Sequence, residues 1–120
     1  MNKYKKENSL QFRKEKSKYL LNKYPNKIPI VIQKSSRDKI LPELSIVKCL
    51  VPPDLTLNHL LINIKSKYLI DLNPSVALYI FTENNKIVSG NQYISSLYED
   101  YKNKEDNFLY LFYCSENTFG

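Results

Sequence analysis

The 120-residue sequence predicts an α+β fold of the β-grasp type, and three observations support this prediction. Two apolar, strand-like segments, residues 28–32 and 46–51, are bracketed by proline and joined by a polar connection. A segment with helical periodicity, residues 57–68, follows the second strand. Two further apolar strands come later in the chain. A strand pair, a crossing helix and then more strands is the order of elements in a β-grasp.

The N-terminal part predicts one helix. Residues 1–8 are polar, and we expect them to fray. Residues 9–23 have helical spacing, with Ser9 as the cap and with the lysines and Arg13 mostly off the apolar stripe. The helix should end at Tyr24-Pro25, because a residue before proline is pushed out of helical space. The expected stripe is Leu10, Ser17, Leu20, Leu21 and Tyr24.

The strand pair follows. Residues 28–33 are almost continuously apolar, which is typical of a central strand that is buried on both faces. Residues 34–45 are too polar to predict a place in the core. The second strand, residues 46–51, ends at Pro52, and proline is tolerated at a sheet edge. An edge strand offers unpaired backbone groups to another peptide.

After the strand pair, Thr56 is well placed to cap a helix over residues 57–68. Residues 73–74, Asn-Pro, predict a turn, and residues 76–82 predict a third strand. The buried stripe of the helix should be Leu57, Leu60, Leu61 and Ile64.

The C-terminal part alternates turn, helix and strand. Residues 83–86 predict a turn, residues 92–101 a short helix and residues 102–107 a charged loop. Residues 108–114 predict a last strand, and residues 115–120 predict a tail without periodicity. The inward residues of the short helix should be Ile94, Leu97 and Tyr98.

Length and composition predict one domain with one core, and no apolar run approaches the roughly 20 residues of a membrane span. The N-terminus has no apolar segment after its lysines, so we expect no secretory signal. Cys49 and Cys114 do not form a disulfide framework, and we expect a reduced, cytosolic chain. Whether the two cysteines pair is left open by the sequence.

The net charge of +6 is unevenly distributed. Residues 1–39 hold twelve Lys/Arg and three Asp/Glu, a balance of +9, whereas residues 40–120 hold six and nine, a balance of −3. A cationic face of this kind suits acidic peptides, anionic lipid or nucleic acid. A solvated, lysine-rich helix explains it equally well.

The sequence contains no credible catalytic set, metal site or cofactor site. His59 is the only histidine, and it falls on a predicted helix. With Gly90 and Gly120 as the only glycines there is no phosphate-binding loop. The acidic pairs at residues 99–100 and 105–106 are most simply solvated. We therefore expect a protein that is not an enzyme.

Gly120 is the last residue, and a terminal glycine is narrow enough to enter an active site as an acyl donor. Over about residues 10–120 the chain resembles the autophagy ubiquitin-like modifiers, the GABARAP and light-chain-3 group. The resemblance is carried by the segments KYPNKIPIVIQK, CLVPPDLTL, VALYIF, SLYEDYK, NFLYLFY and SENTFG.

The resemblance implies a ubiquitin-like β-grasp with two additional N-terminal helices. It divides the single domain, residues 1–120, into a helical extension (1–25), a core (26–114) and a flexible conjugation tail (115–120). It also implies that an activating enzyme and a conjugating enzyme transfer Gly120 to phosphatidylethanolamine, and that a cysteine protease removes it. Whether Gly120 is encoded as the last residue or results from trimming is left open.

The family docks peptides with an aromatic-x-x-aliphatic motif as an added strand on the edge formed by residues 46–51. By resemblance, the aromatic pocket involves Leu20, Pro29, Lys48, Leu50 and Phe108. The aliphatic pocket involves Val51, Pro52, Leu55 and Leu60. Acidic residues that flank the motif would meet Lys27, Lys48 and Lys67.

The chain departs from the family at four positions of this region. A family glutamate is Lys16, a lysine is Ile46, a tyrosine is Cys49 and a phenylalanine is Leu60. We expect peptide binding to be retained with an altered preference. The second pocket should be wider, and acidic contacts should shift toward the N-terminal lysines.

The resemblance places the protein in the cytosol and, after lipidation, on autophagosome or vesicle membranes, or on a plastid-derived organelle in a parasite. The alternative is an unconjugated β-grasp adaptor that binds acidic peptides or nucleic acid. Nucleic-acid binding would need aromatic residues interleaved with lysines on an open sheet face. Most of the ten tyrosines fall instead in apolar strands or helix stripes, so we expect no nucleic-acid partner.

Overall fold

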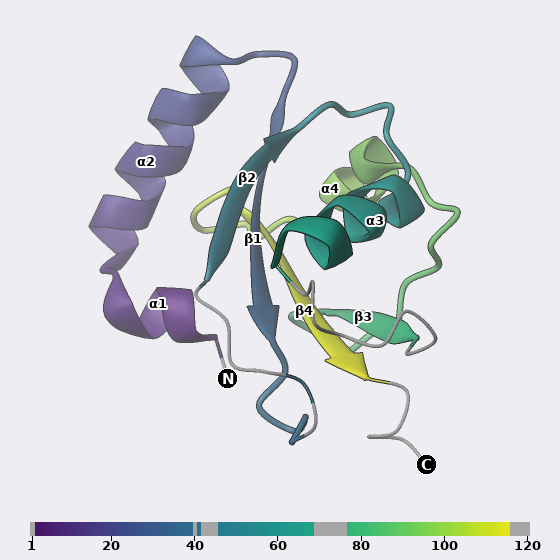
Figure 1. Cartoon of the computed structure of the whole chain (residues 1–120). Helices are drawn as coiled ribbons and strands as arrows, with labels where there is room; N and C mark the ends of the chain where they lie inside the picture. Colours follow the sequence, from purple (N-terminus) through teal and green to yellow (C-terminus); the bar gives the residue numbers. More distant parts are fainter. Residues whose placement is uncertain (1, 40, 42–45, 69–76, 116–120) are drawn as a thin grey trace.

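The computed structural model describes residues 2–39, 41, 46–68 and 77–115 (Figure 1). The predicted order of elements is confirmed, with one additional helix at the N-terminus. The elements are α1 (Lys3–Glu7), α2 (Leu10–Lys23), β1 (Ile28–Lys34), β2 (Val47–Val51), α3 (Leu57–Tyr68), β3 (Leu78–Thr82), α4 (Ile94–Tyr101) and β4 (Leu109–Ser115).

The four strands form one mixed sheet in the order β2-β1-β4-β3. β1 is antiparallel to β2 and parallel to β4, and β3 is antiparallel to β4. The predictions of a buried central strand and an edge strand are confirmed, because residues 28–33 are all buried and β2 has one neighbour. Helices α1 and α2 lie on one side of the sheet, and α3 and α4 lie on the other (Figure 1). This is the ubiquitin-like β-grasp arrangement with two N-terminal helices.

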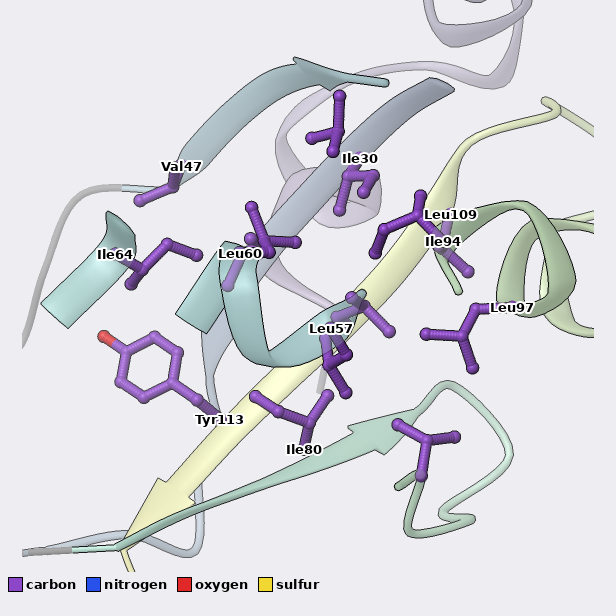
Figure 2. Close-up of a cluster of buried hydrophobic side chains, with 14 of the residues drawn as sticks. Ile30, Val47, Leu57, Leu60, Ile64, Ile80, Ile94, Leu97, Leu109 and Tyr113 are labelled. Carbon is purple, nitrogen blue, oxygen red and sulfur yellow. The ribbon is translucent and has the colours of Figure 1, made fainter. Parts of the chain in front are cut away.

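The main core lies between the sheet and the pair α3–α4 (Figure 2). Alternate residues of each strand point to this side, as the two-residue period of a strand requires, and they meet the apolar stripes of the helices. Three residues of the predicted α3 stripe are buried, as expected, and the fourth, Leu61, is half-buried. Figure 2 labels the central members Ile30, Val47, Leu57, Leu60, Ile64, Ile80, Ile94, Leu97, Leu109 and Tyr113.

A smaller core lies on the opposite side of the sheet, under α1 and α2. The rings of Tyr4 and Phe108 meet edge to face with centroids 5.6 Å apart, and Val31 and Tyr110 complete the cluster. The expectation that residues 1–8 fray is therefore wrong for residues 2–8, which the structure describes. The side chain of Asn2 caps α1 and Tyr4 is 4% exposed, so packing stabilises a helix too short to form alone.

A buried ion pair joins α2 to the loop before β4. Arg13 Nη1 donates to Asp106 Oδ2 over 2.5 Å, and Tyr110 Oη donates to the same oxygen. Ser17 Oγ donates to the backbone oxygen of Asp106. Two expectations are wrong here: Arg13 is buried, not off the stripe, and Asp106 is 0% exposed, not solvated. Leu10 and Tyr24, placed on the stripe, are exposed.

The connection after β1 also differs from expectation, because Asp38 and Leu41 are buried. The Asp38 carboxylate accepts hydrogen bonds from the backbone N–H groups of Leu41 (2.8 Å) and Ser115 (2.5 Å). A carboxylate can be buried where backbone donors satisfy it. Ser115 is buried in β4, so the strand includes the first residue of the expected tail.

The remaining boundaries agree closely with the predictions. Thr56 Oγ1 accepts from His59 N over 3.4 Å at the start of α3. Asn85 has a φ of 62° in the predicted turn, a conformation that asparagine tolerates. Strands β2, β3 and β4 each begin one or two residues later than predicted, and α4 begins two later. The expected turn at residues 73–74 and the tail at 116–120 lie outside the described residues.

No helix within the described ranges is long and apolar enough to span a bilayer.

Candidate peptide-docking site

The edge strand β2 turns backbone groups away from the sheet, and Pro29 shows which ones. Pro29 pairs with Leu50 in the antiparallel ladder, yet proline has no N–H to exchange. In an antiparallel ladder, pairs that exchange two hydrogen bonds alternate with pairs that exchange none. Because Pro29 has no N–H to donate, the pair Pro29–Leu50 is one that exchanges none. Lys48 lies two residues earlier on β2, so its pair with Val31 likewise exchanges no hydrogen bonds. The N–H and C=O groups of Lys48 and Leu50 therefore point outward, where an added strand could bond to them.

A hollow of about 340 Å³ lies beside these outward groups, between the N-terminal helices and β2. Four of the five residues predicted for the aromatic pocket line it: Leu20, Lys48, Leu50 and Phe108. Leu50 is half-buried, while Phe108 is 3% exposed and forms the floor. Pro29 is buried and does not line the hollow.

Four further residues line the hollow and were not predicted: Tyr4, Lys16, Ile30 and Cys49. Tyr4 was missed because the segment around it was expected to fray. Lys16 was noted only as a departure from the family, although its position on α2, four residues before Leu20, places it on the same side of the helix.

The residues predicted for the aliphatic pocket lie where β2 ends and α3 begins. Val51 and Leu60 are 4% and 5% exposed and belong to the main core, whereas Pro52 and Leu55 are half-buried. Core packing therefore fills this region in the present conformation. A side chain could enter it only if α3 and β2 separated locally.

The three predicted acid-binding lysines are exposed, and they lie at different places along the site. Lys48 lines the hollow. Lys27 immediately precedes Ile28, which pairs with Val51, so it lies toward the aliphatic end. Lys67 is in the last turn of α3 and acts electrostatically on Cys49. The lysines thus flank the site and do not form one cluster.

Cys49 and Cys114 are both free thiols, which answers the question of pairing that the sequence left open. Cys49 is half-buried on β2, and Cys114 is 1% exposed on β4. Burial raises the pKa of Cys49 to about 11, and the nearby charge of Lys67 only partly offsets this effect. The Cys49 thiol is therefore neutral at neutral pH.

We expect slow alkylation of Cys49 by iodoacetamide at pH 8, rising as the pH approaches 11. A pKa near 11 instead of 9.0 lowers the thiolate fraction at pH 8 by about a hundredfold, and the thiolate is the nucleophile. Intact mass over time measures the rate, and a Cys49→Ala variant shows the contribution of Cys114. Labelling of Cys49 at the rate of a free cysteine at pH 8 would contradict the burial of this thiol.

Within the ranges that the structure describes, no group of three His, Cys, Asp or Glu side chains is placed to hold a metal ion. His59 is exposed, and its Nδ1 lies 3.0 Å from Thr56 Oγ1 at the start of α3, which is a capping arrangement. The chemistry that this site offers is recognition: outward backbone groups, an apolar hollow and flanking ammonium groups.

Comparison with known proteins gives a consistent result. The family model described as "Autophagy protein Atg8 ubiquitin like" matches residues 12–120. The chain is 38% identical over 117 residues to microtubule-associated protein 1 light chain 3 gamma of Homo sapiens, covering 98% of the chain and 78% of that protein. It is 38% identical to autophagy-related protein 8D of Oryza sativa subsp. japonica, covering 98% and 96%. The crystal structure of Trypanosoma brucei ATG8 superposes with a TM-score of 0.87 at 28% identity, covering 100% and 99% of the two chains.

Proposed function

Because the chain belongs to the Atg8 family of autophagy ubiquitin-like proteins, we propose that it is a modifier conjugated through Gly120 to phosphatidylethanolamine. On the membrane it recruits adaptors and cargo receptors that carry aromatic-x-x-aliphatic motifs during autophagosome formation. The protein is cytoplasmic before conjugation and membrane-associated afterwards. The proposal includes no nucleic-acid partner and no catalytic role for the chain itself.

The observation that carries the docking part of this proposal is the edge strand β2 above its hollow. An extended peptide bonds to the outward groups of Lys48 and Leu50 and extends the sheet by one strand. Its aromatic side chain enters the hollow against Leu20 and Phe108. Backbone pairing supplies affinity for any extended peptide, and the hollow supplies the preference for an aromatic residue.

The aliphatic side chain, three residues further along the peptide, binds at the other end of β2. We place it among Val51, Pro52, Leu55 and Leu60. Since Val51 and Leu60 are core residues in the free protein, this pocket opens on binding as α3 moves from β2. Lys27 and Lys67, at this end of the site, and Lys48, at the hollow, meet acidic residues that flank the motif.

The conjugation part rests on the family match, which extends to Gly120. The proposed partners are the activating and conjugating enzymes of the lipidation pathway, a delipidating cysteine protease and the phosphatidylethanolamine membrane. In this scheme residues 1–25 are a helical extension, the β-grasp core follows, and residues 116–120 are the conjugation tail. Asp38, which binds Ser115 N, fixes the base of that tail.

Replacing Gly120 with alanine should abolish the lipid adduct, because a methyl group on the α carbon, next to the acyl carbon, obstructs the narrow active sites that accept glycine. The measurement is reconstitution with the activating and conjugating enzymes, ATP and phosphatidylethanolamine liposomes, read by intact mass. An Ile62→Ala variant is the matched control, because Ile62 is 63% exposed on α3 and should be conjugated normally. An undiminished adduct with the alanine variant would refute Gly120 as the attachment point.

An unconjugated adaptor for acidic peptides or nucleic acid is the second candidate, and the lysines beside the hollow favour it. Lys16 and Lys48 both line that hollow, so acidic ligands could bind without any lipid. Two results together would favour this second candidate. The wild-type chain would form no lipid adduct, and it would bind an oligonucleotide tightly and with a steep salt dependence.

A further inference from the structure

A second hollow, of about 680 Å³, continues the first one toward the N-terminus of β2. The two hollows share Tyr4, Lys16 and Lys48, so together they form one trough between the N-terminal helices and β2. The second hollow is also lined by Lys3, Glu7, Phe12 and Ile46. Its charged side chains are thus three lysines and one glutamate, beside two apolar side chains.

The order of the two proposed pockets fixes the direction of a docked peptide. The aromatic residue binds beside Leu50, and the aliphatic residue, which follows it in the peptide, binds beside Val51 and Pro52. The peptide therefore runs parallel to β2. Residues that precede the aromatic residue must extend back along the trough, toward Ile46.

Strand periodicity then assigns the upstream positions. Side chains of an extended peptide alternate between the two faces, so every second residue points toward α1 and α2. With the aromatic residue (position 0) level with Leu50, position −2 lies level with Lys48 and position −4 lies level with Ile46. Leu50, Lys48 and Ile46 themselves alternate in this way on one face of the sheet.

The chemistry of the trough differs at these two levels. Lys16 on α2 and Lys48 on β2 both line the shared part of the trough, which suits a carboxylate at position −2. At the next level Phe12, 49% exposed, and the half-buried Ile46 offer an apolar surface. An apolar side chain at position −4 would cover this surface.

We propose that the trough selects an apolar residue at position −4, bound by Phe12 and Ile46, so that the full motif is apolar-x-acidic-x-aromatic-x-x-aliphatic. The contact of Lys48, with Lys16 beside it, to the acidic residue belongs to the docking function already proposed. The proposal rests on the proposed docking function and adds an upstream anchor to it. The occupant is the N-terminal extension of the same peptide that fills the aromatic hollow. Charge complementarity and continuity with that hollow support this assignment.

The first test compares synthetic peptides by isothermal titration calorimetry on the full chain. One peptide has leucine at −4, glutamate at −2, phenylalanine at 0 and valine at +3. Replacing the leucine with alanine should weaken binding about fivefold or more, as expected for burying a leucine side chain in a partly open site. Moving the leucine to −3 should lose the same gain, because that side chain points to the opposite face.

The second test uses variants of exposed trough residues. Phe12→Ala should weaken the leucine peptide about fivefold and leave the alanine peptide unchanged. Lys16→Gln should weaken the glutamate peptide about two- to fivefold, and a glutamine peptide should not respond. Lys18→Gln is the matched control, because Lys18 is exposed on α2 and lines a different hollow, beside Glu105.

The outcomes separate this proposal from the one on which it rests. If the peptide with alanine at −4 and glutamine at −2 binds, but leucine and glutamate add nothing, the extended motif is wrong and the docking function stands. The same conclusion follows if Phe12→Ala and Lys18→Gln behave alike toward the leucine peptide. If no aromatic-x-x-aliphatic peptide binds at millimolar concentration, the docking function itself fails.

Discussion

Replacing Asp106 with asparagine should lower the free energy of unfolding by about 3 to 5 kcal/mol, the usual effect of removing one partner of a buried ion pair. Asp106 is 0% exposed and Arg13 is 8% exposed, so water cannot compensate the guanidinium that is left without its carboxylate. The geometry adds to the loss. Asp106 Oδ2 accepts from both Arg13 and Tyr110, and an amide NH₂ group in its place would face two donors.

The buried state of this network is also reflected in the titration of Tyr110. Burial, and next the hydrogen bond to the Asp106 carboxylate, raise the pKa of Tyr110 far above its ordinary value. Tyr110 therefore stays protonated and keeps donating to Asp106 throughout the neutral range. Between pH 6 and 9 the stability of the network should not depend on pH through this phenol, because even the ordinary pKa of a tyrosine is about 10.

Urea unfolding followed by circular dichroism measures the effect, with the free energy obtained by linear extrapolation. Glu105→Gln is the matched control, because it removes the neighbouring charge from an exposed side chain and should change stability by about 0.5 kcal/mol or less. A second readout is peptide affinity. The network holds α2 in place, and α2 supplies Lys16 and Leu20 to the hollow. A loss below about 1 kcal/mol for Asp106→Asn would show that the ion pair does not hold α2 to the core.

This network also explains where prediction from the sequence fails. Arg13 and Asp106 lie 93 residues apart, and each lies in a charged segment whose pattern predicts exposure to solvent. Local patterns report which face of an element is apolar, and they carry no information on which charges meet after folding. Asp38 is a similar case, because its burial depends on Ser115, which is 77 residues away.

The strands and α3 were predicted because their signals are local. Prolines mark the ends of β1 and β2, and α3 begins at the predicted residue after Thr56. The residue pattern did not predict helix α1, which only the family resemblance implied, because its four charged residues and one tyrosine form no apolar stripe. The burial of Tyr4 against Phe108 and the cap from Asn2 stabilise it. Because α1 was not predicted from the residues, Tyr4 was not assigned to the pocket, and the trough between α1, α2 and β2 was not predicted either.

The outward orientation of the β2 backbone leads to the second large effect: Lys48→Pro should weaken peptide binding about tenfold beyond Lys48→Ala, while the fold is retained. Both variants remove the ammonium group, so the difference between their peptide affinities measures the contribution of the Lys48 backbone. Proline removes the N–H that would bond to the peptide, and its ring occupies the position of the added strand. Because that N–H does not bond to β1, and because proline is tolerated on edge strands, the cost in stability should be about 1 kcal/mol or less.

Cys49→Pro is the matched control on the same strand. Cys49 pairs with Ile30 in the class that exchanges both hydrogen bonds, so its N–H points into the sheet. Proline there breaks a ladder bond and leaves a buried carbonyl of β1 unpaired, which should cost about 2 kcal/mol or more. Urea unfolding and calorimetric titration of one aromatic-x-x-aliphatic peptide separate the two effects. If Lys48→Pro unfolds the protein as readily as Cys49→Pro, then the backbone of Lys48 bonds to β1 and β2 offers no free edge at this residue. If instead Lys48→Pro folds and binds the peptide as Lys48→Ala does, the peptide does not dock as an added strand.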